Sequence, residues 1–400
     1  MNAFSRRQLI ILIYILAFVS AIGNPIVLPS LPFIMQDFSL TPLEMGMVIS
    51  VYALPGVIII PLYGVLSDRL GRRPLLLTAL FLCAAGSLLC WGAPNFFWLL
   101  AGRALQGLSI TPLEAMGNTL GSDLFSGEDR MRFITKVTAV QYFSIAITPL
   151  IVSFLLSIGG WRMSFFYAVL LGGVSLILAL PIKVPYQPSK GISLHEYSRH
   201  LRILLSSPRA LSLFSVRMGS ALIIFGAIYP HLSLFVEKIL RTAPEDTAIL
   251  FTLYAVGMFL GAMLAQWCMK HFSPRTTGFF GGMMLVASML LLLFGSLFWY
   301  AAPALLLVGT GTGIINTCCT AHVSLVSTPD TRGSIMSAYS TIFRLGQAAA
   351  PLLFSFFYQL GSFDAVFGMG LMFAIALTTV AVVSFSYAAK LEHVHNDLHS

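Results

Sequence analysis

Charged side chains are scarce in this sequence. Asp and Glu contribute 15 of the 400 residues and Lys and Arg contribute 23, so that only 10% of the chain is charged. A soluble domain covers its surface with about 25% charged residues. The shortage excludes an ordinary soluble fold and, together with a hydrophobic content of 57%, predicts a membrane protein.

The patterns that carry enzyme chemistry are also missing. No Gly-Lys-Ser/Thr phosphate loop and no G-x-S-x-G occur, and His195-Glu196 is followed by Arg199 where a zinc-protease helix needs its second His. The cysteines form no C-x-x-C pair, so neither a zinc site nor a disulfide framework is supported. We therefore expect no enzyme, no metal and no cofactor. The five cysteines, all in apolar stretches, are Cys83, Cys90, Cys268, Cys318 and Cys319.

The net charge of +8 is spread over short loops between apolar runs. Such a distribution follows the positive-inside rule and argues against a nucleic-acid partner. It predicts a multi-pass protein of the cell membrane with both termini in the cytoplasm. A signal peptide is the alternative for the first run, 9–28, but no small-residue cleavage site follows it.

Twelve apolar stretches are long enough to cross a bilayer. The longest polar stretch, 183–209, falls between the sixth and the seventh. We predict an all-α membrane protein with a six-helix bundle over 1–182, a cytoplasmic linker over 183–209, a second bundle over 210–389 and a cytoplasmic tail over 390–400. The sixth span is expected to follow an outer turn at Trp161-Arg162 and to run to about Pro181. The other spans are expected near 9–28, 45–66, 75–93, 96–122, 134–158, 211–236, 247–270, 276–298, 301–326, 334–358 and 365–389.

The two halves repeat each other. Pro149 and Pro351 are 202 residues apart, and the same offset separates Arg7 from Arg209. A constant offset across a chain indicates duplication. Two pseudo-symmetric six-helix bundles with a binding site between them are typical of secondary transporters.

One charged loop, 64–74, lies between the second and third spans and resembles the signature loop of the major facilitator superfamily. An ordinary positive-inside loop would explain its arginines but not Asp68 or the glycine spacing. The resemblance implies the major facilitator fold and a cytoplasmic charge network of Asp68, Arg69, Arg72 and Arg130. The matching positions are Gly64, Leu66, Asp68, Arg69, Gly71, Arg72 and Arg73, joined elsewhere by Pro29, Pro32 and Trp161-Arg162-x-x-Phe165-Phe166.

Two ionisable residues of the fourth span are candidates for proton coupling, because charge inside a bilayer is costly. Arg103-x-x-Gln106-Gly107 resembles the family's motif in this span, which implies that Arg103 faces the cavity and takes part in proton transfer. Its alternative is a structural arginine bonded to neighbouring helices. Glu114 follows eleven residues later, on the same helical face and about 16 Å along the axis. A pairing with a basic residue, or a place in a wet vestibule, is the alternative for Glu114.

Arg217 and Arg344 add positive charge in the second half. With three arginines and one acid inside spans, the sequence favours an anionic substrate. His322 is a further candidate, although a packing histidine is the more common case. The residues that we expect to line the substrate cavity are Asn24, Gln106, Gln141, Arg217, His322 and Arg344.

The most similar branch of the family comprises drug and metabolite:proton antiporters, so we expect proton-coupled efflux of a small organic molecule by a monomer. The glycine-rich motif of span five is eroded around Pro149, where Ser144, Thr148, Val152 and Ser153 stand at its glycine positions. Uptake of an anionic nutrient by proton symport therefore stays open. From another class, a non-transporting sensor would need an appended soluble domain, and the linker is too short for a large one.

Overall fold

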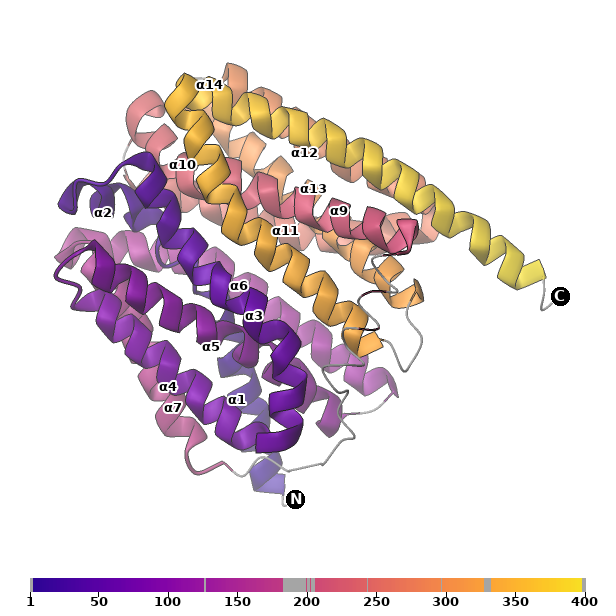
Figure 1. Ribbon diagram of the computed structural model, residues 1–400, viewed down its shortest axis with the longest axis horizontal. Coiled ribbons are helices and arrows are strands. Elements are labelled where there is room, and N and C mark those ends of the chain that lie inside the picture. The colour runs from indigo at the N-terminus through magenta and orange to yellow at the C-terminus, as the bar shows by residue number, and fades with distance from the viewer. Residues whose placement is uncertain are drawn as a thin grey trace. The chain divides into compact units, whose positions relative to one another are not determined.

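A computed structural model describes the backbone of residues 3–125, 127–182, 199, 202, 206–242, 244–295, 297–326 and 332–397. Its helices are drawn in Figure 1. Every regular element in these ranges is a helix. Some side chains within these ranges lie outside the description. They are those of residues 3–5, 64, 65, 68, 69, 118, 122, 123, 209, 244, 324–326, 332–334 and 386–397.

Contacts within the chain divide it into two compact units. Unit 1 comprises 1–194 with 247–249, and unit 2 comprises 195–246 with 250–400. The helices of unit 1 are α1 (Ala3–Ala21), η1 (Leu28–Ser30), α2 (Leu31–Asp37), α3 (Pro42–Leu70), α4 (Arg72–Trp91), α5 (Phe96–Leu124), α6 (Gly127–Gly159) and α7 (Arg162–Ala179). Within unit 1, α5 packs against α3 and α4, while α1 packs against α5, α6 and α7.

Unit 2 begins with a span that changes its helical type. The segments in order are α9 (Pro208–Leu222), η2 (Ile223–Ile228), α10 (Tyr229–Phe235) and η3 (Val236–Leu240), of which η2 and η3 are π-helices. The remaining helices of unit 2 are α11 (Pro244–His271), α12 (Pro274–Phe294), α13 (Phe298–Val326) and α14 (Arg332–Asp397). Gly361 and Ser362 depart from helical geometry inside α14, which divides this long helix into two spans.

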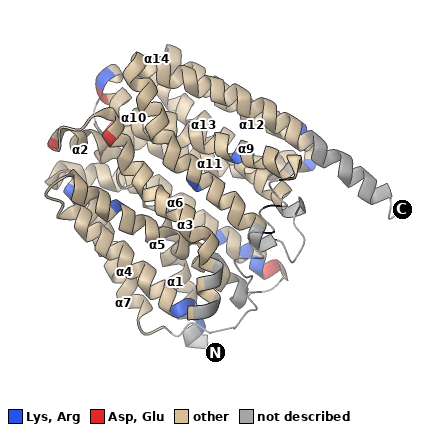
Figure 2. Ribbon diagram, in the orientation of Figure 1, with Lys and Arg blue, Asp and Glu red and all other residues tan. Residues whose placement is uncertain are grey.

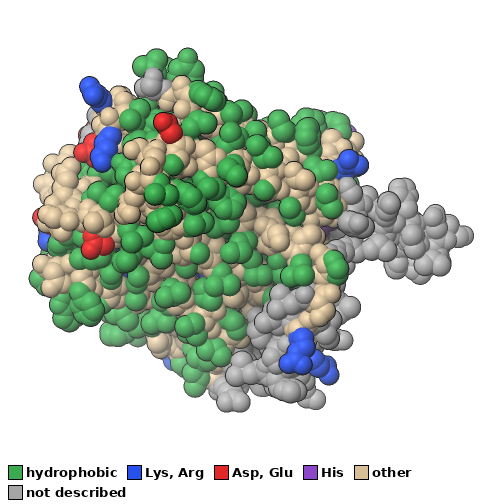
Figure 3. All heavy atoms as spheres, turned by 45° about the horizontal axis from the view of Figure 1, so that its top comes forward, with side chains coloured by type: hydrophobic (Ala, Val, Ile, Leu, Met, Phe, Trp, Pro, Cys, Tyr) green, Lys and Arg blue, Asp and Glu red, His purple; other side chains and the backbone are tan. Residues whose placement is uncertain are grey.

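The described helices have the length and composition of membrane spans. Nine of them are long and apolar enough, and one of the nine, Ile335–Phe385, contains the break at Gly361 and Ser362. Adding α1 and α5 and counting α14 as two gives the twelve expected spans. Figure 2 shows that most charged residues lie near helix ends. In Figure 3, hydrophobic side chains cover much of the visible face and charged ones lie toward its margins.

The first span ends earlier than the sequence predicts. The apolar run continues to Leu28, but α1 ends at Ala21 and a turn precedes η1. Pro25 removes a backbone donor and restricts Asn24, so the helix cannot continue through this segment. The unwound turn leaves the carbonyl group of Gly23 and the side chain of Asn24 available to other helices.

Glycines allow α11 and α13 to cross closely. An added Cβ at Gly261 would collide with the backbone carbonyl of Thr310, and one at Gly309 with the carbonyl of Tyr254. Only glycine permits this backbone approach. At Gly117 of α5, by contrast, no atom lies within 4 Å of the position that a Cβ would take.

Candidate functional site

Arg103 is the centre of a buried polar cluster in unit 1. Its side chain is 0% exposed, and its guanidinium group donates to oxygens from three helical segments. Nε donates to the carbonyl of Val48 at 3.0 Å, and Nη1 donates to the carbonyl of Gly23 at 2.8 Å. Nη1 also reaches Oε1 of Gln106 at 2.8 Å, and Nη2 reaches Oδ1 of Asn24 at 3.2 Å. All four acceptors are neutral.

The local sequence explains this arrangement. Pro25 ends α1 and frees the Gly23 carbonyl, while Gln106 lies three residues after Arg103 and therefore on the same face of α5. The ring of Tyr52 on α3 covers the cation, with 4.2 Å between the guanidinium carbon and the ring centroid. The arrangement matches the alternative of a structural arginine that is hydrogen-bonded to neighbouring helices.

The side chains of Asn24 and Gln106 are hydrogen-bonded to Arg103 in this cluster. Asn24 is 8% exposed and Gln106 is 4% exposed. Nε2 of Gln106 donates to Oγ of Ser87 at 2.8 Å. The cavity beside Gln106 and Ser87 measures about 10 Å³, which is room for one water molecule at most. Within unit 1 these side chains therefore bind Arg103.

Glu114 lies in a different environment from Arg103, although both belong to α5. The side chain of Glu114 is exposed and that of Arg103 is fully buried. The shared helical face that the spacing predicts does not give the two side chains one environment, because the turn at Gly23 and Asn24 and the helix α3 lie against Arg103. Gln141, another predicted cavity residue, is half-buried on α6.

In unit 2, Arg217 of α9 lies against two aromatic rings of α14. Its guanidinium carbon is 3.8 Å from the ring centroid of Phe343 and 5.0 Å from that of Tyr339. Nε of Arg217 is buried and has no acceptor among the described residues. The aromatic faces stabilise the cation without neutralising its charge.

The other two candidates of unit 2 have hydrogen-bond partners within their own helices. Nη1 of Arg344 donates to Oε1 of Gln347 at 2.8 Å. His322 is 5% exposed, its Nδ1 contacts the carbonyl of Cys318 at 2.7 Å, and its ring stacks on Phe385 with 4.8 Å between centroids. This is the environment expected of a packing histidine.

An ion pair at the end of unit 1 where α5 begins was not predicted from the sequence. Oδ2 of Asp37 accepts from Nη1 of Arg162 at 2.9 Å and from Nε1 of Trp161 at 3.0 Å. Arg162 also donates to the carbonyl of Ala93 at 3.3 Å. These bonds join the end of α2, the start of α7 and the turn between α4 and α5. The Trp-Arg pair was visible in the sequence, but its acceptor is 124 residues away from Trp161.

The comparisons with known proteins place this geometry in a family. The sequence matches the description "Major Facilitator Superfamily" over residues 13–241 and again over 210–397. The chain belongs to the major facilitator superfamily. It is therefore a membrane transporter of small molecules, as its relatives are, and not an enzyme.

Curated relatives within the superfamily include transporters from fungi and bacteria. The chain is 27% identical over 297 residues to "MFS-type transporter TwmF" of Talaromyces wortmannii, which covers 65% of this chain and 52% of that protein. It spans about half the length of that relative. It is 23% identical over 394 residues to "Quinolone resistance protein NorA" of Staphylococcus aureus, covering 96% of this chain and 98% of that protein.

Solved structures of major facilitator transporters share the fold. The human organic anion transporter MFSD10 (TETRAN) matches with a TM-score of 0.70 and 17% identity over 95% of this chain and all of that one. The nucleoside transporter NupG, solved as a point mutant, matches with a TM-score of 0.79 and 12% identity over 94% of this chain and all of that one.

The superfamily's signature loop is described only in part. The side chains of Asp68 and Arg69 lie outside the described residues, Arg72 is half-buried at the start of α4, and Arg130 is exposed on α6. Nearby, Arg73 donates to the carbonyl of Leu180 at 2.8 Å. Arg132 pairs with Glu128 at 2.7 Å, a pair that the sequence analysis did not name. Within the described part of the chain, no group of His, Cys, Asp or Glu is arranged to hold a metal ion.

Proposed function

We propose that this transporter exports a small organic molecule across the cell membrane by alternating access, in exchange for protons. The observation that carries the direction is the nearly full-length match to NorA, whose name assigns it to quinolone resistance. The proposed transporter is a monomer. Both of its termini are proposed to lie in the cytoplasm, because the short loops place an excess of Lys and Arg on that side.

We further propose that the exported molecule carries a negative charge. Arg217 lies against two aromatic rings, and its buried Nε has no acceptor among the described residues. A carboxylate fits a guanidinium fork, and a flat organic group fits the aromatic side chains beside it. The printed name of MFSD10, an organic anion transporter of the same fold, agrees with this substrate class.

Glu114 is the proposed proton-coupling residue. It is a carboxylate inside a spanning helix, it is exposed, and it lies ten residues before the end of α5 at Leu124. A carboxylate inside a spanning helix is a functional candidate, and an exchanger requires a group that can carry the proton. Arg103 serves as a positioning residue, since most of its hydrogen bonds join helices of unit 1.

The direction and the substrate are tested together by untargeted mass spectrometry of cells with and without the gene. Export predicts an anionic compound that accumulates inside cells lacking the gene. A compound that fails to enter such cells would contradict export and favour symport, which the eroded motif around Pro149 allows.

Coupling is tested in proteoliposomes with that compound. In Glu114→Gln, transport driven by a pH gradient should be lost while counterflow continues. Glu245→Gln, which removes an exposed carboxylate from the first turn of α11, is the matched control and should retain both. Loss of both activities in Glu114→Gln, or of neither, would remove the coupling role.

A further inference from the structure

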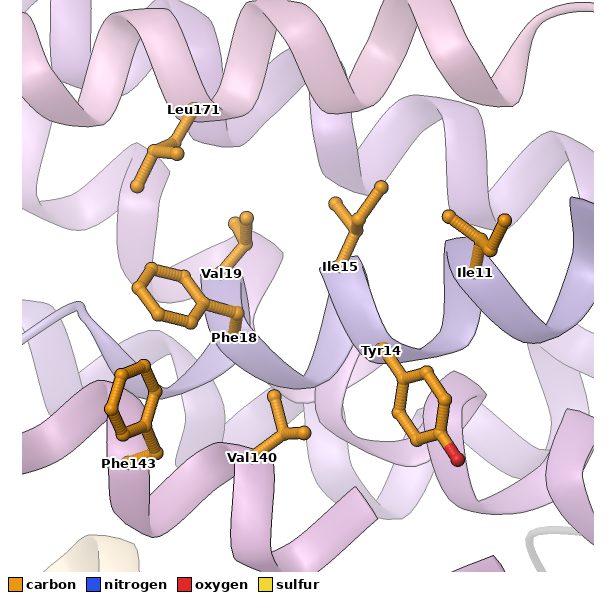
Figure 4. Close-up of a pocket in the computed structure, with 8 residues that line it drawn as sticks. All are labelled: Ile11, Tyr14, Ile15, Phe18, Val19, Val140, Phe143 and Leu171. Carbon is orange, nitrogen blue, oxygen red and sulfur yellow. The ribbon is translucent and has the colours of Figure 1, made fainter. Parts of the chain in front are cut away.

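An apolar groove of about 470 Å³ runs along α1 in unit 1 (Figure 4). Five of the eight lining side chains come from α1, two from α6 and one from α7. Tyr14 alone among them carries a polar side-chain atom, so the groove suits a hydrocarbon and not a soluble metabolite. The lining residues are Ile11, Tyr14, Ile15, Phe18, Val19, Val140, Phe143 and Leu171.

The groove is held in shape by contacts between α1 and α6. Oγ of Ser144 on α6 donates to the carbonyl of Phe18 on α1 at 2.9 Å. The ring of Tyr14 lies 5.5 Å from that of Phe133, measured between centroids. Tyr14 and Phe18 therefore meet Phe133 and Ser144 in the same chain order, which means that α1 and α6 run in parallel.

The groove adjoins surface that faces the bilayer. Phe143 is 61% exposed and Ile11 is 49% exposed. The neighbouring exposed residues of α6 and α7 are also large and apolar, and in a membrane-spanning protein such a surface contacts lipid chains. They include Phe154, Leu170, Val174 and Ile177, each at least 50% exposed.

Two cations mark one end of this groove. Arg7 lies four residues before Ile11 on α1, and Lys136 lies four residues before Val140 on α6. Four residues turn a helix by about 400°, so each cation is on the face that enters the groove. Both side chains are exposed. Because the helices are parallel, Arg7 and Lys136 both lie on the N-terminal side of the groove residues of their own helices.

The neighbouring arginine has a different role. Arg6 donates to the carbonyl of Leu124 at 3.3 Å and lies over the ring of Phe125, so that it ties α1 to the end of α5.

From Ile11 to Val19 the lined part of α1 rises about 12 Å, close to the roughly 15 Å of hydrocarbon in one leaflet. The dimensions of the groove and its charge therefore fit one molecule of membrane lipid.

We propose that this groove is a binding site for an anionic phospholipid. One acyl chain lies along α1 between α6 and α7, and the headgroup phosphate pairs with Arg7 and Lys136. The two cations distinguish an anionic lipid from a zwitterionic one, because each cation near a membrane surface adds attraction for net negative charge. This proposal is independent of the export proposal and concerns a lipid contact of unit 1.

The site is tested by native mass spectrometry of the full chain titrated with phosphatidylglycerol or phosphatidylcholine. The wild type should bind phosphatidylglycerol at least tenfold more tightly. The double variant Arg7→Gln with Lys136→Gln should lose most of that preference. The control Lys270→Gln with Arg275→Gln removes the same charge from unit 2 and should keep it.

Two further variants separate charge from shape. Arg7→Lys with Lys136→Arg keeps both charges and should keep the preference, whereas Val140→Phe should weaken binding of both lipids by filling the groove. Equal binding of the two lipids by the wild type would overturn the proposal, and so would equal loss in the control pair. Competition by glycerol 3-phosphate at lipid-like concentrations would assign the cations to a soluble anion and would also overturn it.

Discussion

Arg103 and Gln106 lie three residues apart on α5, and Nη1 of the arginine donates to Oε1 of the glutamine at 2.8 Å. Gln106 extends this hydrogen-bond network to α4. Its Nε2 donates to Oγ of Ser87, and Ser87 donates to the carbonyl of Cys83 at 2.7 Å. Four residues thus connect the buried charge of α5 to the backbone of α4. A network without a gap makes each of its members important to the packing of unit 1.

Replacing Arg103 by Lys tests the positioning role. Lys keeps the charge but lacks the fork, so it cannot reach Val48, Gly23 and Asn24 together. Each buried acceptor left unsatisfied costs about 1–3 kcal/mol, and we expect a clear fall in thermal stability in detergent. Arg275→Lys, an exposed substitution of the same type, should leave stability unchanged.

The same variant distinguishes positioning from proton transfer. Positioning predicts that Arg103→Lys lowers counterflow and pH-driven transport by the same factor. If counterflow survives while pH-driven transport disappears, the arginine itself handles protons.

Asp37→Ala should destabilise unit 1 more than Asp37→Asn. Asparagine keeps an acceptor for Nε1 of Trp161 and loses only the charge opposite Arg162, whereas alanine loses both contacts. The ion pair is about half-exposed, at 41% and 44%, so the charge contributes at most about 1 kcal/mol. Thermal unfolding at low and high salt checks this; an equal effect of the two substitutions would mean that the hydrogen bond from Trp161 contributes nothing.

Gly261→Ala should force α11 and α13 apart. The added methyl group meets the backbone of Thr310, which cannot rotate away, and overpacking of this kind costs about 1–3 kcal/mol. Gly173→Ala on α7 is the matched control, because nothing lies within 4 Å of its Cβ position and alanine favours a helix. The close crossing would be contradicted if Gly261→Ala lost no stability, or if the control Gly173→Ala also became less stable.

Arg217→Gln should weaken binding of an anionic substrate while leaving the fold intact. The variant removes the charge but keeps a polar group beside Phe343 and Tyr339. We expect the KM of an anionic substrate to rise about tenfold or more, in line with the roughly 1.5–3 kcal/mol of a charged hydrogen bond, and that of an uncharged analogue to stay within about twofold. An equal rise in KM for the anionic substrate and the uncharged analogue would mean that the variant acts through packing and not through charge.

The sequence predicted the twelve spans because their apolar length is a local property. Ala21 shows the limit of that argument, since hydrophobicity continued to Leu28 while Pro25 ended the helix. The close crossing at Gly261 was predictable from spacing. The environment of Glu114 was not, because the depth of a side chain depends on which helices cover it. The bond between Asp37 and Trp161 is equally non-local, since it joins residues 124 positions apart.

The neutral oxygens around Arg103 have an electrical consequence. They bind the guanidinium group without placing a negative charge beside it, and two of them belong to the backbone of unit 1. A membrane potential of 100 mV does about 2.3 kcal/mol of work on an elementary charge that crosses the whole field. The Arg103 guanidinium group keeps the same ligands and therefore does not move relative to unit 1. The membrane potential does no work on it through movement within unit 1. In the proposed exchange cycle, any voltage sensitivity would then come from charges that change position, such as an anionic substrate or the proton.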